Sequence, residues 1–156
     1  MVRSLLLALA LLSAACAPST FPGTAIEDTE ENREVWELLQ RYRRSIEERD
    51  VVDLRKMISR DYFENAATTD DTTDDYGYEK LMADVLPILK DNIKRVKVEL
   101  RVTDIKVGDT KGYATFEYIA RFLYTEGGKE GWVASNDFNR LELVREDGVW
   151  KIAAGL

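Results

Sequence analysis

The stretch YATFEYIARFLYT, from Tyr113 to Thr125, alternates with a period of two residues. One face of it carries six consecutive small or aromatic positions, Ala114, Phe116, Tyr118, Ala120, Phe122 and Tyr124. Because successive side chains of a strand point to opposite faces, the pattern predicts a long strand with one face in a core. The other face mixes Ile119 and Leu123 with charged residues. That mixture favours a curved sheet whose outer face is partly covered or meets a partner.

More strands are predicted on both sides of this one. Before it, alternation over residues 96–102 slips by one residue at Thr103-Asp104, as expected of a β-bulge. After it, the segments 132–145 and 149–154 alternate and are separated by the tight turn Glu146-Asp147-Gly148. The second half of the chain is therefore expected to form a meander of four antiparallel strands.

Helical spacing dominates the first half. A helix is predicted after Asp28 or Thr29, either of which can cap it, and a short second helix is predicted after a cap at Asp50. Helical spacing returns over residues 76–93, where Pro87 predicts a kink or break near residue 86. Between these segments, residues 64–75 have turn chemistry and predict a loop or loose hairpin.

This order of elements predicts the α+β class. Two to three N-terminal helices would pack on a curved antiparallel sheet and form a cone-shaped α+β barrel. A pocket is expected inside the cone.

The first residues are typical of targeting. Arg3 precedes an uninterrupted apolar run, Leu5–Leu12, and small residues then lead to Cys16, the one cysteine in the chain. This arrangement resembles a bacterial lipoprotein signal, in which the cysteine is acylated and becomes the new N-terminus, although Ser13 stands where that signal usually has leucine. The alternative is an ordinary secreted protein with a free thiol. The resemblance implies lipidation at Cys16 and, because Ala17 follows it, a place on the periplasmic face of the outer membrane.

The domain boundaries follow from these segments. We expect a signal peptide over residues 1–15, a flexible tether over residues 16–27, which is rich in Pro, Gly, Ser and Thr, and one domain over residues 28–156.

Charge and composition exclude several classes of function. The net charge of −7 gives no support for nucleic-acid binding. The chain has no histidine, which removes the commonest general base and metal ligand and every Ser–His or Cys–His nucleophile. We expect no cofactor and no metal: the acids Asp70, Asp71, Asp74 and Asp75 lack EF-hand spacing, so a solvated loop is favoured over a calcium site.

Two motifs give a resemblance to a known family. RDYF at residues 60–63, after the second helix, and EDGVWKI at residues 146–152, in the last hairpin, resemble the nuclear transport factor two-like superfamily, which is also described as cystatin-like. That superfamily includes ketosteroid isomerases, polyketide cyclases, scytalone dehydratase and many non-catalytic pocket domains. The resemblance implies a cavity between the helices and the concave sheet. It identifies the fold better than the activity, and no complete catalytic set is matched.

Polar residues near the expected cavity are the candidate site. Asp137 and Asn139 share a face with core residues and are expected at the wider mouth of the cone, where an apolar setting would raise the pKa of Asp137 and make it a plausible general base. The alternative places this half of the strand in solvent. Asp61 and Tyr62 end the second helix, as an alternative base and a donor, although Tyr62 is more simply a core aromatic. Tyr118 is expected in the pocket wall.

Two further features complete the predictions. Tyr76 and Tyr78, beside Gly77, could fold over the mouth as a lid. The outer sheet face could form a homodimer or dock a partner through Tyr113, Ile119 and Leu123. The function expected is a membrane-anchored lipoprotein that binds a small apolar ligand or a partner without catalysis. The alternatives are an isomerase, cyclase or dehydratase with an Asp base, and a structural or adaptor lipoprotein.

Overall fold

The computed structural model describes residues 19–65 and 72–156. The elements run in the order α2 (Glu30–Glu48), α3 (Val51–Met57), β1 (Phe63–Glu64), β2 (Tyr76–Gly77), α4 (Tyr78–Lys80), a π-helical turn η1 (Leu81–Val85), α5 (Leu86–Asp91), β3 (Ile93–Val107), β4 (Lys111–Glu126), β5 (Lys129–Glu146) and β6 (Val149–Ala154). Cys16, Asp70 and Asp71 lie outside the described residues. The structure therefore does not test the predicted lipidation of Cys16 and does not describe this part of the acidic segment.

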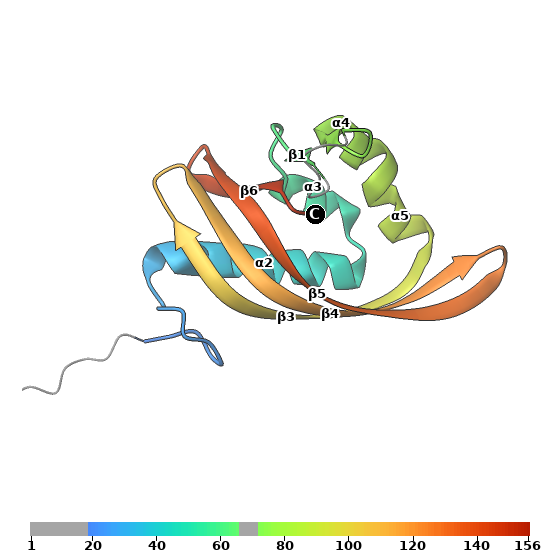
Figure 1. The fold of residues 1–156 in the computed structure, drawn as a ribbon, viewed down its shortest axis with the longest axis horizontal. Helices are drawn as coiled ribbons and strands as arrows, with labels where there is room; N and C mark the ends of the chain where they lie inside the picture. The colour runs from blue at the N-terminus through green and yellow to red at the C-terminus, as the bar shows by residue number, and fades with distance from the viewer. Residues whose placement is uncertain (1–18, 66–71) are drawn as a thin grey trace, which may run out of the picture.

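A curved four-stranded sheet is the centre of the fold. Its strands are antiparallel in the order β3-β4-β5-β6, and the helices lie within its concave side (Figure 1). The predicted α+β class is confirmed. The sheet stays open in the described part of the chain, so the cone is not a closed barrel.

The predicted core strand is β4. On its concave face Ala114, Phe116 and Ala120 are almost fully buried. The predicted bulge is also confirmed, because the pairing of β3 with β4 shifts register between Val102 and Asp104. The bulge increases the local twist, which helps the sheet to curve over the helices.

Capping residues begin the two main helices where the sequence placed them. Thr29 accepts a hydrogen bond from the backbone N–H of Asn32 at the start of α2. Asp50 accepts one from the backbone N–H of Asp53 at the start of α3. Each side chain satisfies an N–H group that has no partner inside the helix.

The helix expected over residues 76–93 is shorter and more irregular than predicted. Tyr76 and Gly77 form β2, which pairs with β1, so helical structure begins at Tyr78. Before Pro87 the chain makes a π-helical turn, in which the N–H of Leu86 donates to the carbonyl of Leu81. Pro87 then lies in the first turn of α5, where its missing N–H costs little.

The tether prediction is corrected for residues 19–27. Phe21 and Ile26 are buried, and the Phe21 ring stacks on Trp36 of α2 with 4.4 Å between ring centroids. Thr20 also forms a β-bridge with Glu27. This segment is therefore part of the domain, since two apolar side chains in a Pro/Gly-rich stretch find a place on α2.

Candidate functional site

A cavity of about 260 Å³ lies between the helices and the concave face of the sheet. Its lining residues come from α2, α5, β3, β4, β5 and the last residue of the chain: Tyr42, Ile46, Leu89, Val98, Leu100, Phe116, Tyr118, Ala120, Phe122, Asn139 and Leu156. Most of these side chains are apolar, and none of them is charged. The cavity is where the family resemblance placed it.

Two phenols and one amide are the polar side chains of this lining. Burial, together with the nearby Tyr118 phenol, raises the pKa of Tyr42 to about 12. The Tyr42 phenol therefore stays protonated at neutral pH and can donate a hydrogen bond. The hydroxyl of Tyr118 lies 3.4 Å from the hydroxyl of Ser135 on β5, which fixes its orientation at the wall.

Asn139 connects the cavity wall to the end of the chain. Its amide nitrogen donates to the carbonyl oxygen of Gly155 at 2.8 Å. Its amide oxygen accepts from the backbone N–H of Arg140 at 2.7 Å. Each end of the amide makes one of these hydrogen bonds, so Asn139 positions the last residues of the chain.

The last two residues, Gly155 and Leu156, form a strap over the cavity. The N–H of Gly155 donates to a carboxylate oxygen of Glu64 at 2.7 Å, and the N–H of Leu156 donates to the hydroxyl of Tyr62 at 3.1 Å. The hydroxyl of Tyr76 donates to the carbonyl oxygen of Leu156 at 3.3 Å. These bonds hold the Leu156 side chain in the cavity lining.

Tyr62 is occupied by this strap. The residue is 2% exposed, and its hydroxyl donates to Glu64 at 3.2 Å while it accepts from Leu156. Burial raises the pKa of Tyr62 well above its usual range. Tyr62 is not among the cavity-lining residues, so its hydroxyl serves the fold.

The prediction that Asp137 lies in an apolar pocket is wrong. Pairing with Tyr118 puts it on the concave face, as expected, but its side chain is exposed. The cause is the length of β6, which pairs only with residues 142–146 of β5 and leaves the preceding half open to solvent. The carboxylate accepts a hydrogen bond from the backbone N–H of Phe138 at 2.8 Å.

Asp61 is also remote from the cavity. The chain turns after α3, the N–H of Asp61 donates to the hydroxyl of buried Ser59, and the Asp61 side chain is exposed. Asp137 and Asp61 are both in solvent, and no Asp or Glu side chain of residues 19–65 and 72–156 lines the cavity, so the catalytic arrangement considered from the sequence is not assembled there.

The two lid candidates separate. Tyr76 lies against the strap through its bond to Leu156. The ring of Tyr78 instead packs under the guanidinium of Arg60, 4.6 Å from the ring centroid, beside a surface hollow on α3. The strap of Gly155 and Leu156 covers the cavity where Tyr76 and Tyr78 were expected to form a lid. No pattern in the sequence indicates this strap.

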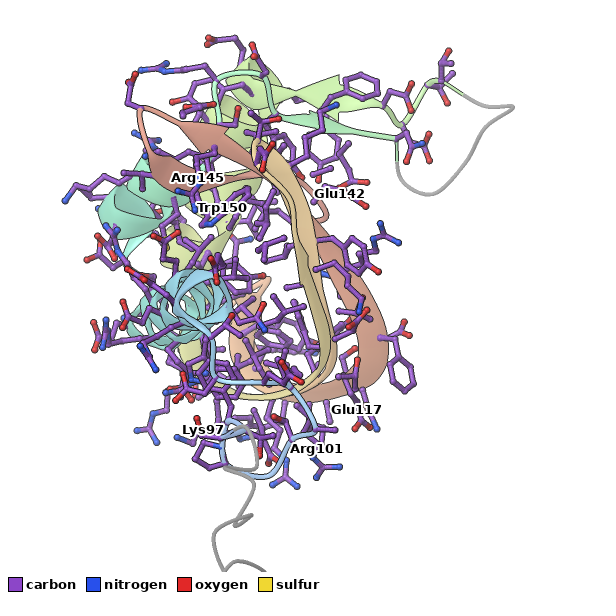
Figure 2. The ribbon with its side chains drawn as sticks, turned by 90° about the vertical axis from the view of Figure 1, so that its left-hand side faces the viewer. Lys97, Arg101, Glu117, Glu142, Arg145 and Trp150 are labelled. Carbon is purple, nitrogen blue, oxygen red and sulfur yellow. The ribbon has the colours of Figure 1, made fainter. Side chains whose placement is uncertain are left out.

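A larger groove of about 330 Å³ lies on the other side of α2, beside Trp150. The Arg145 guanidinium lies 4.7 Å from the Trp150 ring centroid (Figure 2). It also forms an ion pair with Glu34. Because most of the groove's polar lining is charged and solvated, we take the apolar cavity as the better binding site.

The outer face of the sheet carries several charged side chains that pair with one another. Arg101 lies 2.9 Å from Glu99 and 3.3 Å from Glu117. Arg101 and Glu117 lie away from the helices (Figure 2). The Arg140 guanidinium covers the ring of Tyr113 at 3.7 Å. Ile119 and Leu123 are half-buried among these side chains. The outer-face dimer remains a prediction.

Metal-binding clusters and membrane-spanning helices are both absent from residues 19–65 and 72–156. No three His, Cys, Asp or Glu side chains in these ranges are placed to hold a metal ion. Nor does any helix of these ranges have the length and hydropathy needed to cross a membrane.

Sequence reasoning missed three parts of the site. Tyr42 falls in the first predicted helix, but helical spacing does not mark its hydroxyl as a donor to a cavity. Glu64 and Leu156 act through the strap, for which the sequence offers no periodic signal.

Comparison with known proteins supports the fold. No protein-family model and no curated protein matches the chain. A nuclear transport factor 2-like superfamily protein from Salmonella enterica matches with a TM-score of 0.62 and 13% identity, over 79% of this chain and 86% of that one. A proposed scytalone dehydratase from Novosphingobium aromaticivorans matches with a TM-score of 0.64 and 13% identity, over 80% of each chain. An uncharacterised cystatin-like protein from Caulobacter vibrioides matches with a TM-score of 0.59 and 17% identity, over 81% of this chain and 87% of that one.

These similarities show a nuclear transport factor two-like fold and nothing more specific. Proteins with this fold include ones named as enzymes and ones with no assigned activity. The function has to be argued from the cavity.

Proposed function

We propose that this nuclear transport factor two-like domain binds a small, largely apolar molecule that carries one hydrogen-bond acceptor, and binds it without chemical change. The observation that carries the proposal is the cavity lining: apolar walls, two phenols and no charged side chain. Such a site desolvates an apolar ligand favourably and disfavours a charged one, which would lose its hydration without gaining a partner.

The volume of the cavity indicates that the ligand is small. Small-molecule sites usually measure about 300–1,000 Å³, so this cavity of about 260 Å³ is just below the usual range. A molecule of one or two fused rings suits this space better than a long acyl chain.

The two phenol hydroxyls are the reason for expecting a hydrogen-bond acceptor on the ligand. With its pKa raised to about 12, Tyr42 remains a donor throughout the physiological range. Tyr118 lies on the opposite wall, on β4. A ligand carbonyl or ether oxygen between these walls would accept a hydrogen bond that an unsubstituted hydrocarbon cannot.

Among the described residues, the lining has no Asp or Glu side chain, which favours binding over proton abstraction. A general base must lie within hydrogen-bond reach of the proton that it removes. Asp137 and Asp61 are exposed and do not line the cavity. This is why we place the isomerase, cyclase and dehydratase alternatives second.

For localisation we retain the lipoprotein hypothesis. Its support is the sequence around Cys16: a positive leader, an apolar run, small residues and one cysteine. A domain tethered in this way would meet ligands at the periplasmic face of the outer membrane.

Two matched ligands test the binding proposal. 2-Acetylnaphthalene carries a ketone acceptor, whereas 2-ethylnaphthalene has nearly the same shape without one. We expect titration calorimetry to detect both, with tighter binding of the ketone. Tyr42→Phe should weaken the ketone about tenfold, the value of a net hydrogen bond of about 1.4 kcal/mol, and leave the hydrocarbon unchanged.

A cavity-filling variant locates the site. Ala120→Phe, at a buried lining position, should abolish binding of both ligands. Ala83→Phe, at an exposed position on η1, is the matched control and should bind as the unmodified chain does. Failure of either ligand to bind at millimolar concentration, or binding unaffected by Ala120→Phe, would overturn the proposal.

A further inference from the structure

The outer edge of β5 is largely unpaired. β5 spans Lys129–Glu146, but β6 pairs only with residues 142–146, so residues 129–141 have β4 on one side and no strand of the described chain on the other. An unpaired edge presents a row of N–H and C=O groups that can accept another strand.

Two hydrogen bonds show which groups face outward. The N–H of Phe138 donates to its neighbour Asp137, and the N–H of Arg140 donates to its neighbour Asn139. These N–H groups therefore point away from β4. Because hydrogen-bonding direction alternates along an antiparallel strand, the N–H groups of Trp132, Ala134 and Asn136 also point outward.

The edge is thus divided into a guarded half and an open half. In the guarded half, residues 137–140, side chains cap the outward N–H groups, and Gly155 packs against the carbonyl of Arg140. In the open half, residues 130–136, no hydrogen bond found in the described chain caps an outward N–H. Asp137, considered above as a base, is one of the two guards.

The open half also exposes apolar surface. Trp132 is 61% exposed and Val133 46%, and they line a hollow of about 400 Å³ with Arg121 and Ala134. Phe138, at the border of the guarded half, is 69% exposed. The β4–β5 hairpin extends beyond the helices, so no helix of the described residues covers this end of the sheet (Figure 1). Unpaired backbone and exposed apolar side chains together mark an interaction surface.

We propose that the open half of β5 pairs with the same segment of a second copy of this chain, with the two strands antiparallel about a two-fold axis at Ala134. The small side chain of Ala134 would face its own copy at the axis. Trp132 would pair opposite Asn136 and lie diagonal to Phe138 of the second copy, within reach of an aromatic contact. This isologous arrangement joins the two sheets into one.

Charge complementarity favours a second copy as the occupant. In this register Lys129 lies diagonal to Asp137 of the second copy, and Glu130 lies diagonal to Arg140 of the second copy. Symmetry repeats each pair, so opposite charges meet on both faces of the joined sheet. A chain with net charge −7 can self-associate most readily where its own surface is balanced in this way.

The guarded half limits the register in one direction, and the diagonal pairs of Glu130 with Arg140 and of Trp132 with Phe138 limit it in the other, because an axis at Val133 would separate both pairs. A two-fold axis one residue beyond Ala134, at Ser135, would also match outward groups. It would, however, bring Arg140 into the ladder, where its N–H is capped by Asn139 and its carbonyl is covered by Gly155. The axis at Ala134 takes hydrogen bonds from the uncapped N–H groups at positions 132, 134 and 136.

Cysteine pairs test this register. Antiparallel pairing about Ala134 places Val133 opposite Ser135 of the second copy in a non-hydrogen-bonded pair, with Cα atoms about 4.5 Å apart. That separation is within the range for a disulfide. In the full chain carrying Cys16→Ala, which removes the one native thiol, the Val133→Cys/Ser135→Cys variant should form a covalent dimer on mild oxidation. Either single variant should form less than a tenth as much.

Association without cross-linking is measured separately. Sedimentation of the Cys16→Ala chain should show a dimer that dissociates on dilution. Ala134→Pro removes the central N–H and should raise the dissociation constant of the dimer at least tenfold. Its circular dichroism spectrum should stay unchanged. A monomer at all concentrations would overturn the proposal, as would single variants that cross-link as well as the double variant. A dimer broken by an outer-face change, Ile119→Arg, and not by Ala134→Pro would also overturn it and support face-to-face packing.

Discussion

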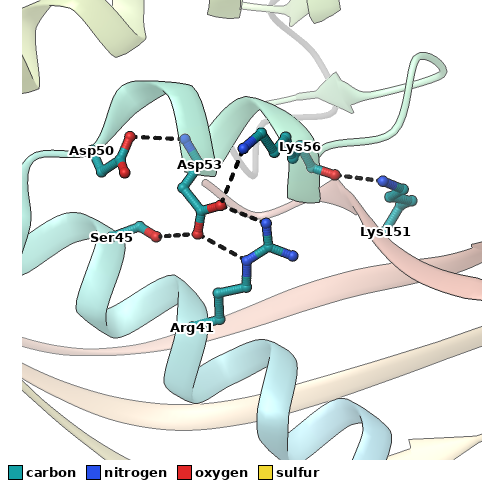
Figure 3. Close-up of polar contacts among 6 residues, drawn as sticks. All are labelled: Arg41, Ser45, Asp50, Asp53, Lys56 and Lys151. Atoms are coloured by element: carbon teal, nitrogen blue, oxygen red, sulfur yellow. Dashed lines mark hydrogen bonds and ion pairs between the residues drawn. The ribbon is translucent and has the colours of Figure 1, made fainter.

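The guanidinium of Arg41 forms a bidentate ion pair with the carboxylate of Asp53, with N–O distances of 2.8 and 2.5 Å. The buried hydroxyl of Ser45 donates a third hydrogen bond to the same carboxylate at 3.0 Å, and Lys56 lies 3.9 Å away (Figure 3). This cluster joins α2 to α3, which follow one another in the chain.

This cluster should make the stability of the domain depend on pH. The bonds from Arg41 lower the pKa of Asp53 from 3.8 to about 2. A carboxyl with a lowered pKa in the folded state stabilises the fold above its unfolded pKa of 3.8, and that contribution is lost as the pH falls toward 2. Because the side chains of Asp53 and Arg41 are 25% and 38% exposed, we discount the effect to about 1 kcal/mol.

Urea unfolding of Asp53→Asn checks this prediction. The variant should be less stable than the unmodified chain by about 1 kcal/mol at pH 7, and the difference should shrink as the pH is lowered from 4 to 2. Asp61→Asn, at an exposed carboxyl, serves as the control and should show no such trend. A difference that stays constant with pH would contradict the ion-pair account.

A second prediction concerns Tyr62. If its hydroxyl holds the strap, Tyr62→Phe leaves the N–H of Leu156 without its acceptor and should lower the free energy of unfolding by about 1–3 kcal/mol. Tyr76→Phe removes a longer bond from a more exposed residue and should cost less than about 1 kcal/mol. Chemical denaturation measures both. Equal losses, or none for Tyr62→Phe, would count against the strap.

The fold was largely predictable because its signals are local. Alternation over residues 113–125 predicted β4, and a slip in phase at Thr103-Asp104 predicted the bulge. The caps at Thr29 and Asp50 were legible because each acts within three residues of its partner.

The site was less predictable because it depends on how far elements extend. The sequence placed Asp137 on the correct face, but its exposure follows from the missing neighbour: β6 has 6 residues and β5 has 18. That mismatch was visible in the sequence and could have indicated an open edge. The strap could not be predicted, since Glu64, Tyr62 and Leu156 are joined only by tertiary structure.

A third prediction tests how closely the strap fits. Gly155 has a φ of +93°, and a Cβ atom there would lie 2.2 Å from the carbonyl oxygen of Arg140. Gly155→Ala should therefore displace the strap, and hydrogen exchange at the N–H of Leu156 should accelerate at least tenfold. The matched control is Gly148→Ala, which has a φ of +80° with no atom near the added carbon. It should destabilise the β5–β6 turn without exposing Leu156, and acceleration in both variants would contradict the specific contact.

A fourth prediction concerns the anchor. If Cys16 is acylated, the mature chain expressed in a bacterial host should sediment with membranes and carry the mass of its acyl groups. Cys16→Ala should lose that mass and become soluble in the periplasm, because two or more acyl chains give stable anchoring that the polypeptide alone does not supply. Ser13→Leu, which strengthens the lipoprotein pattern, is the matched control and should remain anchored. An unmodified cysteine in the mature chain would support ordinary secretion.

The last prediction separates an edge guard from a general base. Asp137→Asn keeps an oxygen that can accept from the N–H of Phe138, but it removes the charge that a base requires. Because the Asp137 side chain is exposed and does not line the cavity, the affinity for 2-acetylnaphthalene should stay within twofold of the unmodified chain at both pH 5 and pH 8. Tyr42→Phe, in the same titrations, should weaken the ketone about tenfold, as argued above from the net value of a hydrogen bond. If Asp137→Asn weakened the ketone as much as Tyr42→Phe does, Asp137 would have to reach the ligand, and the open edge of β5 would have to close over the cavity when the ligand binds.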